Sequence, residues 1–173
     1  MLIKRNKKAQ VAVLDLFIAA MIFGILVTAI MITWNDYNEK IDKRISQNTN
    51  LIRAYHISDL LTRYAGKPSA WEKFGEDTAE DPLTIIGLAK EDHVIDNDKL
   101  TTFLSLDYNY TKDKLSINSY EYYFKILNID GSDFNPVIEK GIKMNNTNYV
   151  TLKRYVIYNE SEAILEFWLS SQE

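Results

Sequence analysis

The chain contains no cysteine among its 173 residues. Disulfide bonds, thiol nucleophiles and thiolate metal sites are therefore excluded from its chemistry. Histidine is scarce, with only His56 and His93. The sequence also holds no nucleophile elbow, phosphate-binding loop or zinc-binding helix motif. We therefore expect no catalytic residue, no metal site and no cofactor, and we do not expect the protein to be an enzyme.

Positive and negative charges are distributed unevenly along the chain. Residues 1–9 carry four basic side chains and no acidic one, whereas residues 35–173 hold 23 acidic side chains against 16 basic ones. An acidic domain lacks the electrostatic attraction to phosphates on which nucleic-acid binding depends. We therefore expect no nucleic-acid partner.

A long apolar run occupies residues 11–34, of which 20 of 24 are apolar. As a helix it would span about 36 Å, enough for a hydrocarbon core of about 30 Å. A signal peptide has a shorter apolar region, of about 7–15 residues, followed by small residues at the cleavage site. Residues 10–34 are therefore expected to form a retained transmembrane helix. The basic residues before it predict a cytoplasmic N-terminus and an extracellular C-terminal domain.

Asp15 is the one charged residue inside this run. A carboxylate at the centre of a spanning helix costs about 2.5–3.5 kcal/mol on insertion scales, and less near an end. Either Asp15 lies close to the cytoplasmic headgroups, near Lys7 or Lys8, or it pairs with a positive group of a neighbouring subunit. The spacing supports both interpretations.

The helix is expected to continue beyond the membrane, because residues 35–64 contain neither glycine nor proline. One apolar stripe follows helical spacing. Its members are Trp34, Tyr37, Ile41, Ile45, Ile52 and Tyr55. From Ile57 onward the apolar positions fall on the opposite side, so either the helix kinks near His56 or its last turns are covered on a second side. Residues 65–68, Ala-Gly-Lys-Pro, end the helix.

The last third of the sequence alternates as strands do. We expect strands at 120–129 and 137–144 and a hairpin of 149–158 with 163–169. An antiparallel sheet packed on the second half of the long helix gives an α+β fold. A short helix is predicted at 99–106 with Asp98 as its cap, and a turn at 111–117. The acidic segment 91–98 is interpreted as a solvated loop rather than a cation site.

Aromatic residues and glycosylation sequons mark the same domain. All 11 tyrosines lie in residues 35–173. The sheet face around Tyr123, Leu127, Tyr155 and Ile157 either holds half-buried tyrosines with wet hydroxyls or is covered by a neighbour or a carbohydrate. Three Asn-x-Ser/Thr sequons are candidate sites of N-glycosylation. Their acceptor residues are Asn109, Asn145 and Asn159.

Residues 7–17, Lys-Lys-Ala-Gln-Val-Ala-Val-Leu-Asp-Leu-Phe, resemble the N-terminus of archaeal type IV pilin-like proteins. The resemblance implies that a prepilin peptidase removes residues 1–9 as a leader by cutting between Ala9 and Gln10. It also implies that Asp15 neutralises the new α-amino group of an adjacent subunit. This acid stands one residue later than in the family and is Asp rather than Glu. A cut after Gln10 would restore the family's spacing.

A second signature resembles the extracellular domains of the same family. It consists of Gly-x-Pro-x-x-Trp at 66–71, Ile-Ile-Gly-Leu-Ala at 85–89 and the expected helix at 99–106. The resemblance implies that residues 35–65 are the extracellular half of the long helix. It implies further that residues 66–173 form a globular antiparallel-sheet domain with short helices. No catalytic residues come with this signature.

Together these features predict a structural subunit of an archaeal type IV pilus-like filament on the cell surface. Its expected partners are the membrane, like subunits, a prepilin peptidase and the pilus assembly machinery. Small residues permit close approach of apolar helices, and here they are Ala19, Ala20 and Gly24. The alternative is an uncleaved single-pass membrane protein whose extracellular domain binds a ligand or a partner.

Overall fold

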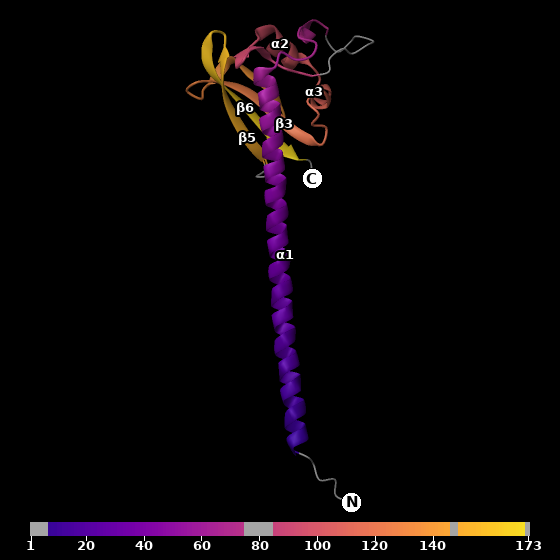
Figure 1. The fold of residues 1–173 in the computed structure, drawn as a ribbon. Helices are drawn as coiled ribbons and strands as arrows, with labels where there is room; N and C mark the ends of the chain where they lie inside the picture. The colour runs from indigo at the N-terminus through magenta and orange to yellow at the C-terminus, as the bar shows by residue number, and fades with distance from the viewer. Residues whose placement is uncertain (1–6, 75–84, 146–148, 172–173) are drawn as a thin grey trace, which may run out of the picture. The chain divides into compact units, whose positions relative to one another are not determined.

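The computed structural model describes residues 7–74, 85–145 and 149–171. The chain divides into two compact units, Met1–Ile45 and Ser46–Glu173. Helix α1, Lys7–Arg63, belongs to both units (Figure 1). The second unit also contains a 3₁₀ helix, η1 (Trp71–Lys73), two short helices and a sheet.

The second unit is an α+β domain, as the sequence predicts. The helices are α2 (Asn97–Ser105) and α3 (Tyr108–Lys114). The strands are β1 (Ala89–Glu91), β2 (Val94–Ile95), β3 (Tyr120–Asn128), β4 (Asp133–Gly141), β5 (Tyr149–Tyr158) and β6 (Ser161–Ser171). They form one sheet in the order β1-β2-β5-β6-β3-β4. The sheet is mixed rather than antiparallel, because β2 pairs in parallel with β5 through Val94 and Ile157.

The first part of α1 is exposed along almost its whole length. From residue 11 to residue 45 every side chain is exposed except the half-buried Val27. Within the described residues, α1 is the one helix long and apolar enough to cross a membrane. The hydrogen bonds within the helix satisfy the backbone N–H and C=O groups of this stretch. Its apolar side chains are therefore the groups that are left exposed to solvent.

The last part of α1 packs on the sheet. Ala54, Ile57 and Leu61 lie in the hydrophobic core together with Phe124 of β3 and Phe167 of β6. The helix continues without interruption past His56 to Arg63. The second of the two expectations is therefore confirmed, because the domain covers the last turns on the side opposite the apolar stripe.

An ion pair fixes this part of α1 to β5. Arg154 donates from Nη2 to Asp59 Oδ1 over 2.8 Å, and from Nε to the hydroxyl of Ser58 over 3.2 Å. Its guanidinium also lies 4.1 Å from the ring centroid of Tyr55. A planar guanidinium can bind a carboxylate and an aromatic face at once, so one side chain holds three positions of the helix.

The core-facing sides of the strands follow the predicted alternation. Tyr122, Phe124 and Ile126 of β3 are fully buried, and Phe124 pairs with Phe167 of β6. The β5–β6 turn has only two residues, Asn159 and Glu160, both with positive φ (49° and 62°). A two-residue turn of this kind suits the twist of a hairpin. Because the turn is short, β6 begins at Ser161, two residues before the predicted start.

Other boundaries also differ from the prediction. Strand β4 begins at Asp133 rather than residue 137, because Asp133 already pairs with Leu127 of β3; a register shift separates this pair from the pair of Ile126 and Ile138. Helix α2 is capped by Asp96 rather than Asp98, since Asp96 Oδ1 accepts from the backbone N–H groups of Asp98 and Lys99. The predicted turn at 111–117 overlaps the end of α3, which is capped by Asp107.

Gly66, Trp71 and Gly87 of the second signature pack closely together in the domain. The indole of buried Trp71 donates from Nε1 to the carbonyl of Gly87 over 2.9 Å. A Cβ on Gly66 would lie 2.4 Å from Trp71 Cδ1, and a Cβ on Gly87 would lie 2.1 Å from the carbonyl oxygen of Tyr64. Neither position has room for a side chain, so the motif is explained by close packing.

Candidate functional site

The residues expected to mediate assembly all lie on the exposed first part of α1. At about 100° per residue, Asp15 and Ala19 are about 40° apart around the helix, and so are Ala20 and Gly24. Gly24, however, lies about 180° from Asp15. The four residues therefore form two pairs on opposite sides, and a neighbouring helix could not contact all of them from one direction.

The Gly24 side is suited to close contact with another helix. Apart from its two chain neighbours and the helix's own backbone, no heavy atom lies within 4 Å of the position that a Cβ on Gly24 would occupy. Thr28 is four residues further on, and its hydroxyl donates to the carbonyl of Gly24 over 2.8 Å. Ala20, Gly24 and Thr28 thus form a row of small side chains whose one hydroxyl is already satisfied within the helix. Such a row fits the close helix packing found in membranes.

The predicted processing site lies at the beginning of α1. Ala9 and Gln10 are within the first turns of the helix, and residues 1–6 of the leader lie outside the described residues. Neither the cut between Ala9 and Gln10 nor a cut after Gln10 is tested by this geometry. Both stay predictions.

The apolar stripe of α1 is exposed. Ile52 is 60% exposed and Tyr55 is 49% exposed, and Trp34, Tyr37 and Ile45 are exposed as well. The sheet covers the opposite side of the helix, where Ala54 and Ser58 are fully buried.

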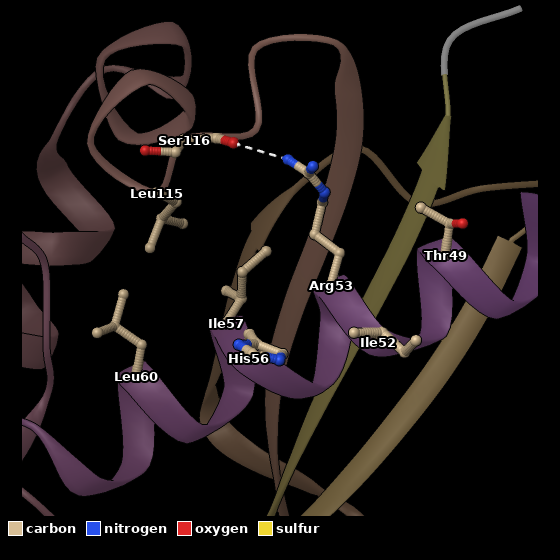
Figure 2. A pocket seen from close by; sticks show the side chains of 8 residues that line it. All are labelled: Thr49, Ile52, Arg53, His56, Ile57, Leu60, Leu115 and Ser116. Atoms are coloured by element: carbon tan, nitrogen blue, oxygen red, sulfur yellow. Dashed lines mark hydrogen bonds between the residues drawn. The ribbon is translucent and has the colours of Figure 1, made fainter.

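A groove of about 510 Å³ lies beside this part of the stripe, within the second unit. Its apolar wall includes Ile52 and Leu60 of α1 and Leu115 after α3, and Figure 2 shows Leu60 and Leu115 pointing toward one another. Arg53 lies in the wall, donates from Nη1 to the carbonyl of Ser116 over 3.1 Å, and stacks over the Tyr120 ring. The guanidinium group of Arg53 is therefore bound within the domain. The groove is largely apolar and continuous with the stripe through Ile52.

A buried polar network joins α3 to β3. The hydroxyl of Thr111 is 2.6 Å from that of Tyr122, and Tyr108 donates to the carboxylate of Glu121, which also binds Lys112. Burial raises the pKa of the Tyr122 phenol, and burial with the Glu121 hydrogen bond raises that of Tyr108. Both phenols are therefore protonated donors at neutral pH. The network positions α3 on the sheet.

The outer sheet face divides into two parts. At one end Trp168 covers Tyr123 edge-to-face, with centroids 5.1 Å apart, and stacks on Tyr149 at 4.8 Å. At the other end Tyr155 is 75% exposed, beside exposed Ile157. The first part is thus covered by the chain's own aromatic residues, whereas the second is uncovered.

The acidic side chains of 91–98 are used within the domain. Asp92 accepts from Arg63 Nε over 3.0 Å and lies 3.1 Å from His93 Nδ1, while Asp96 caps α2. Residues 91–98 form the β1–β2 hairpin and the start of α2 rather than a loop. Among the described residues, no group of three or more His, Asp or Glu side chains is placed to hold a metal ion.

The three sequons lie in different surroundings. Asn159 is exposed at the β5–β6 turn, and Asn109 is exposed in the first turn of α3. Asn145 is also exposed, but Asn146 and Thr147 of its sequon lie outside the described residues. All three match the Asn-x-Ser/Thr pattern, so the match to the pattern does not distinguish them and their surroundings are compared.

Sequence reasoning missed the groove and the row that continues from Gly24 to Thr28. The groove is formed by segments of the chain more than 50 residues apart, so no local sequence pattern indicates it.

Comparison of the chain with protein-family models, with curated proteins and with solved structures finds no match. The architecture itself, a long apolar N-terminal helix followed by a curled sheet, is consistent with a pilin-like protein.

Proposed function

We propose that this chain is a structural subunit of an archaeal type IV pilus-like filament on the cell surface. The observation that carries the proposal is the uncovered apolar surface of α1, on which all side chains from residue 11 to residue 45 except Val27 are exposed. Covering a Val, Leu, Ile, Phe or Met side chain contributes about 1.5–3 kcal/mol relative to leaving it in water. Lipid covers such a surface before assembly, and neighbouring helices cover it in a filament.

The two opposite pairs on α1 support contact with more than one neighbour. Ala20 and Gly24 allow a helix to approach on one side. On the other side, Asp15 offsets the positive α-amino group that a prepilin peptidase creates by cutting between Ala9 and Gln10, or after Gln10. The domain remains outside the cell, with residues 11–34 as the anchor before the assembly machinery extracts the subunit.

The second candidate is an uncleaved single-pass membrane protein with a partner-binding extracellular domain. The groove beside Ile52 and Leu115 favours it, because a concave and largely apolar surface on a folded domain suits ligand or partner binding. In this candidate the basic N-terminus is retained as the cytoplasmic flank.

Processing distinguishes the two candidates. Intact-mass and N-terminal peptide measurements on the protein from its own cells should give a chain beginning at Gln10 or Val11. A chain that retains residues 1–9 in the assembled or surface-exposed fraction would contradict the filament subunit and favour the second candidate.

Asp15 provides a further test of the assembly step. Asp15→Ala should enter the membrane as well as the unmodified protein, because removing a carboxylate lowers the cost of insertion. Filament recovery, measured by shearing and sedimentation, should fall. Asp36→Ala is the matched control, since Asp36 is also an exposed acid of α1 but lies outside residues 11–34. Equal filament yield from Asp15→Ala and the control would exclude the neutralising role.

A further inference from the structure

The sequons of Asn109 and Asn159 share one pattern but differ in structure. We propose that Asn159 carries an N-linked glycan and that Asn109 stays unmodified, because, of these two sequons, which the structure describes in full, the folded domain presents only that of Asn159 to a transferase. The inference rests on one part of the proposed function, the location of the domain outside the cytoplasm.

The Asn159 sequon lies at the tip of the β5–β6 hairpin. Asn159, Glu160 and Ser161 are all exposed, and the first two form the whole turn. Asn159 Oδ1 accepts a hydrogen bond from Asn97 Nδ2 over 2.5 Å. This bond engages the carbonyl oxygen and orients the side chain, while the amide nitrogen, which is the atom to be glycosylated, is on the other branch.

The Asn109 sequon is presented only in part. Asn109 is exposed, but Thr111 is 0% exposed. The Thr111 hydroxyl lies 2.7 Å from the carbonyl oxygen of Tyr108 and 2.6 Å from the Tyr122 hydroxyl. A sequon is recognised through its third residue as well as through asparagine. Exposing Thr111 would require α3 to leave the sheet, with the loss of the buried network around Tyr122.

Turn geometry alone explains Asn159 but not Ser161. Asparagine is favoured where φ is positive, and Asn159 has φ 49° in a two-residue turn. Such a turn requires no hydroxyl at the residue that follows it, where Ser161 pairs with Tyr158. The exposed hydroxyl at this position is the part of the sequon that the hairpin does not need.

The chemistry is a group transfer from a lipid-phosphate-linked oligosaccharide. The Nδ2 atom of Asn159 forms a bond to the anomeric carbon of the first sugar. The bond between that carbon and the phosphate oxygen breaks, and the lipid phosphate leaves with the electron pair. The amide gives up one proton, and no oxidant or reductant takes part.

Glycopeptide mass spectrometry tests the assignment on the full-length protein from cells in which a second, known glycoprotein is modified. We expect one glycan mass on the peptide that contains Asn159 and none on the peptide that contains Asn109. Ser161→Ala should lose the whole glycan mass although Asn159 remains, and Asn109→Gln should keep it. A glycan on Asn109, or an unmodified Asn159, would overturn the proposal.

Protease accessibility of the domain on intact cells separates this inference from the proposed function. An accessible domain with unmodified Asn159 contradicts the glycan alone. A modified Asn159 in a chain that retains residues 1–9 contradicts the filament subunit but supports the glycan. A protected, cytoplasmic domain with no glycan contradicts both.

Discussion

The two parts of helix α1 share one backbone conformation but differ in their surroundings. Up to Ile45 the helix is bordered by solvent on all sides except at Val27, whereas from Asn50 to Thr62 it buries one side in the core. An isolated helix derives little stability from its own hydrogen bonds, and most helices are held by packing of an apolar face. The second part is therefore held by packing on its own domain, whereas the side chains of the first part, except Val27, are exposed.

The two regions also differ in how their exposed apolar residues are distributed. In the domain they are scattered, as is normal for a soluble surface, apart from the stripe and the patch near Tyr155. In the first part of α1 they surround the helix, which is typical of a membrane span. Substitutions should therefore affect one region without affecting the other.

The largest effect is expected from charges in the centre of the apolar run. Ile22→Arg together with Leu26→Arg should cost about 5–7 kcal/mol of insertion free energy, from about 2.5–3.5 kcal/mol for each charge. Membrane fractionation should find the double variant outside the membrane, while the protease resistance of the domain is unchanged. The matched control is Ile22→Leu with Leu26→Ile. An inserted double arginine variant would contradict a spanning role for residues 11–34.

The next effect concerns the core. Phe124→Ala should lower the free energy of unfolding of the domain by about 3–5 kcal/mol, because it opens a cavity in a fully buried site. Phe17→Ala removes the same atoms from an exposed position of α1. Denaturant unfolding in detergent should show no change in domain stability for Phe17→Ala. Equal losses from the two variants would contradict the independence of the two regions.

Glycine to alanine is a smaller test of the same comparison. Gly87→Ala places a Cβ 2.1 Å from the carbonyl oxygen of Tyr64, so the backbone must shift. Overpacking of this kind costs about 1–3 kcal/mol. The Cβ of Gly24→Ala meets no atom within 4 Å outside its chain neighbours and the helix's own backbone, so this variant should leave domain unfolding unchanged. We expect Gly24→Ala to reduce only filament yield, and a destabilised domain in that variant would contradict the assignment of Gly24 to an intersubunit surface.

The smallest effect is expected from acid. Backbone N–H groups of Tyr110 and Asn109 lower the pKa of the Asp107 carboxyl below its ordinary value. The stability from this charged cap is present above the unfolded pKa, about 3.9 for aspartate, and is lost as the pH falls through the lower folded pKa. Asp107→Asn keeps a capping side chain without the charge. Its unfolding midpoint should therefore vary less below pH 4 than that of the unmodified protein, and identical profiles would exclude the charged cap.

Much of the fold could be predicted from local patterns. The absence of glycine and proline predicted α1, the alternation of Tyr122, Phe124 and Ile126 predicted β3, and the turn residues predicted the β5–β6 hairpin. Strands β1 and β2 were missed, since two or three residues carry no readable period. The cap of α2 was placed two residues late because Asp96 and Asp98 are both suitable capping residues.

The sequence by itself determined the apolar membrane-length helix, the acidic domain and the α+β class, because each follows from composition or from a short period. The tertiary structure decided which side of α1 meets the sheet. Ala54, Ile57 and Leu61 lie in the core on the side opposite the apolar stripe, whereas Ile52 and Tyr55 of the stripe stay exposed. It also decided that Thr111 is buried whereas Ser161 is exposed, because burial depends on which distant residues pack around a site.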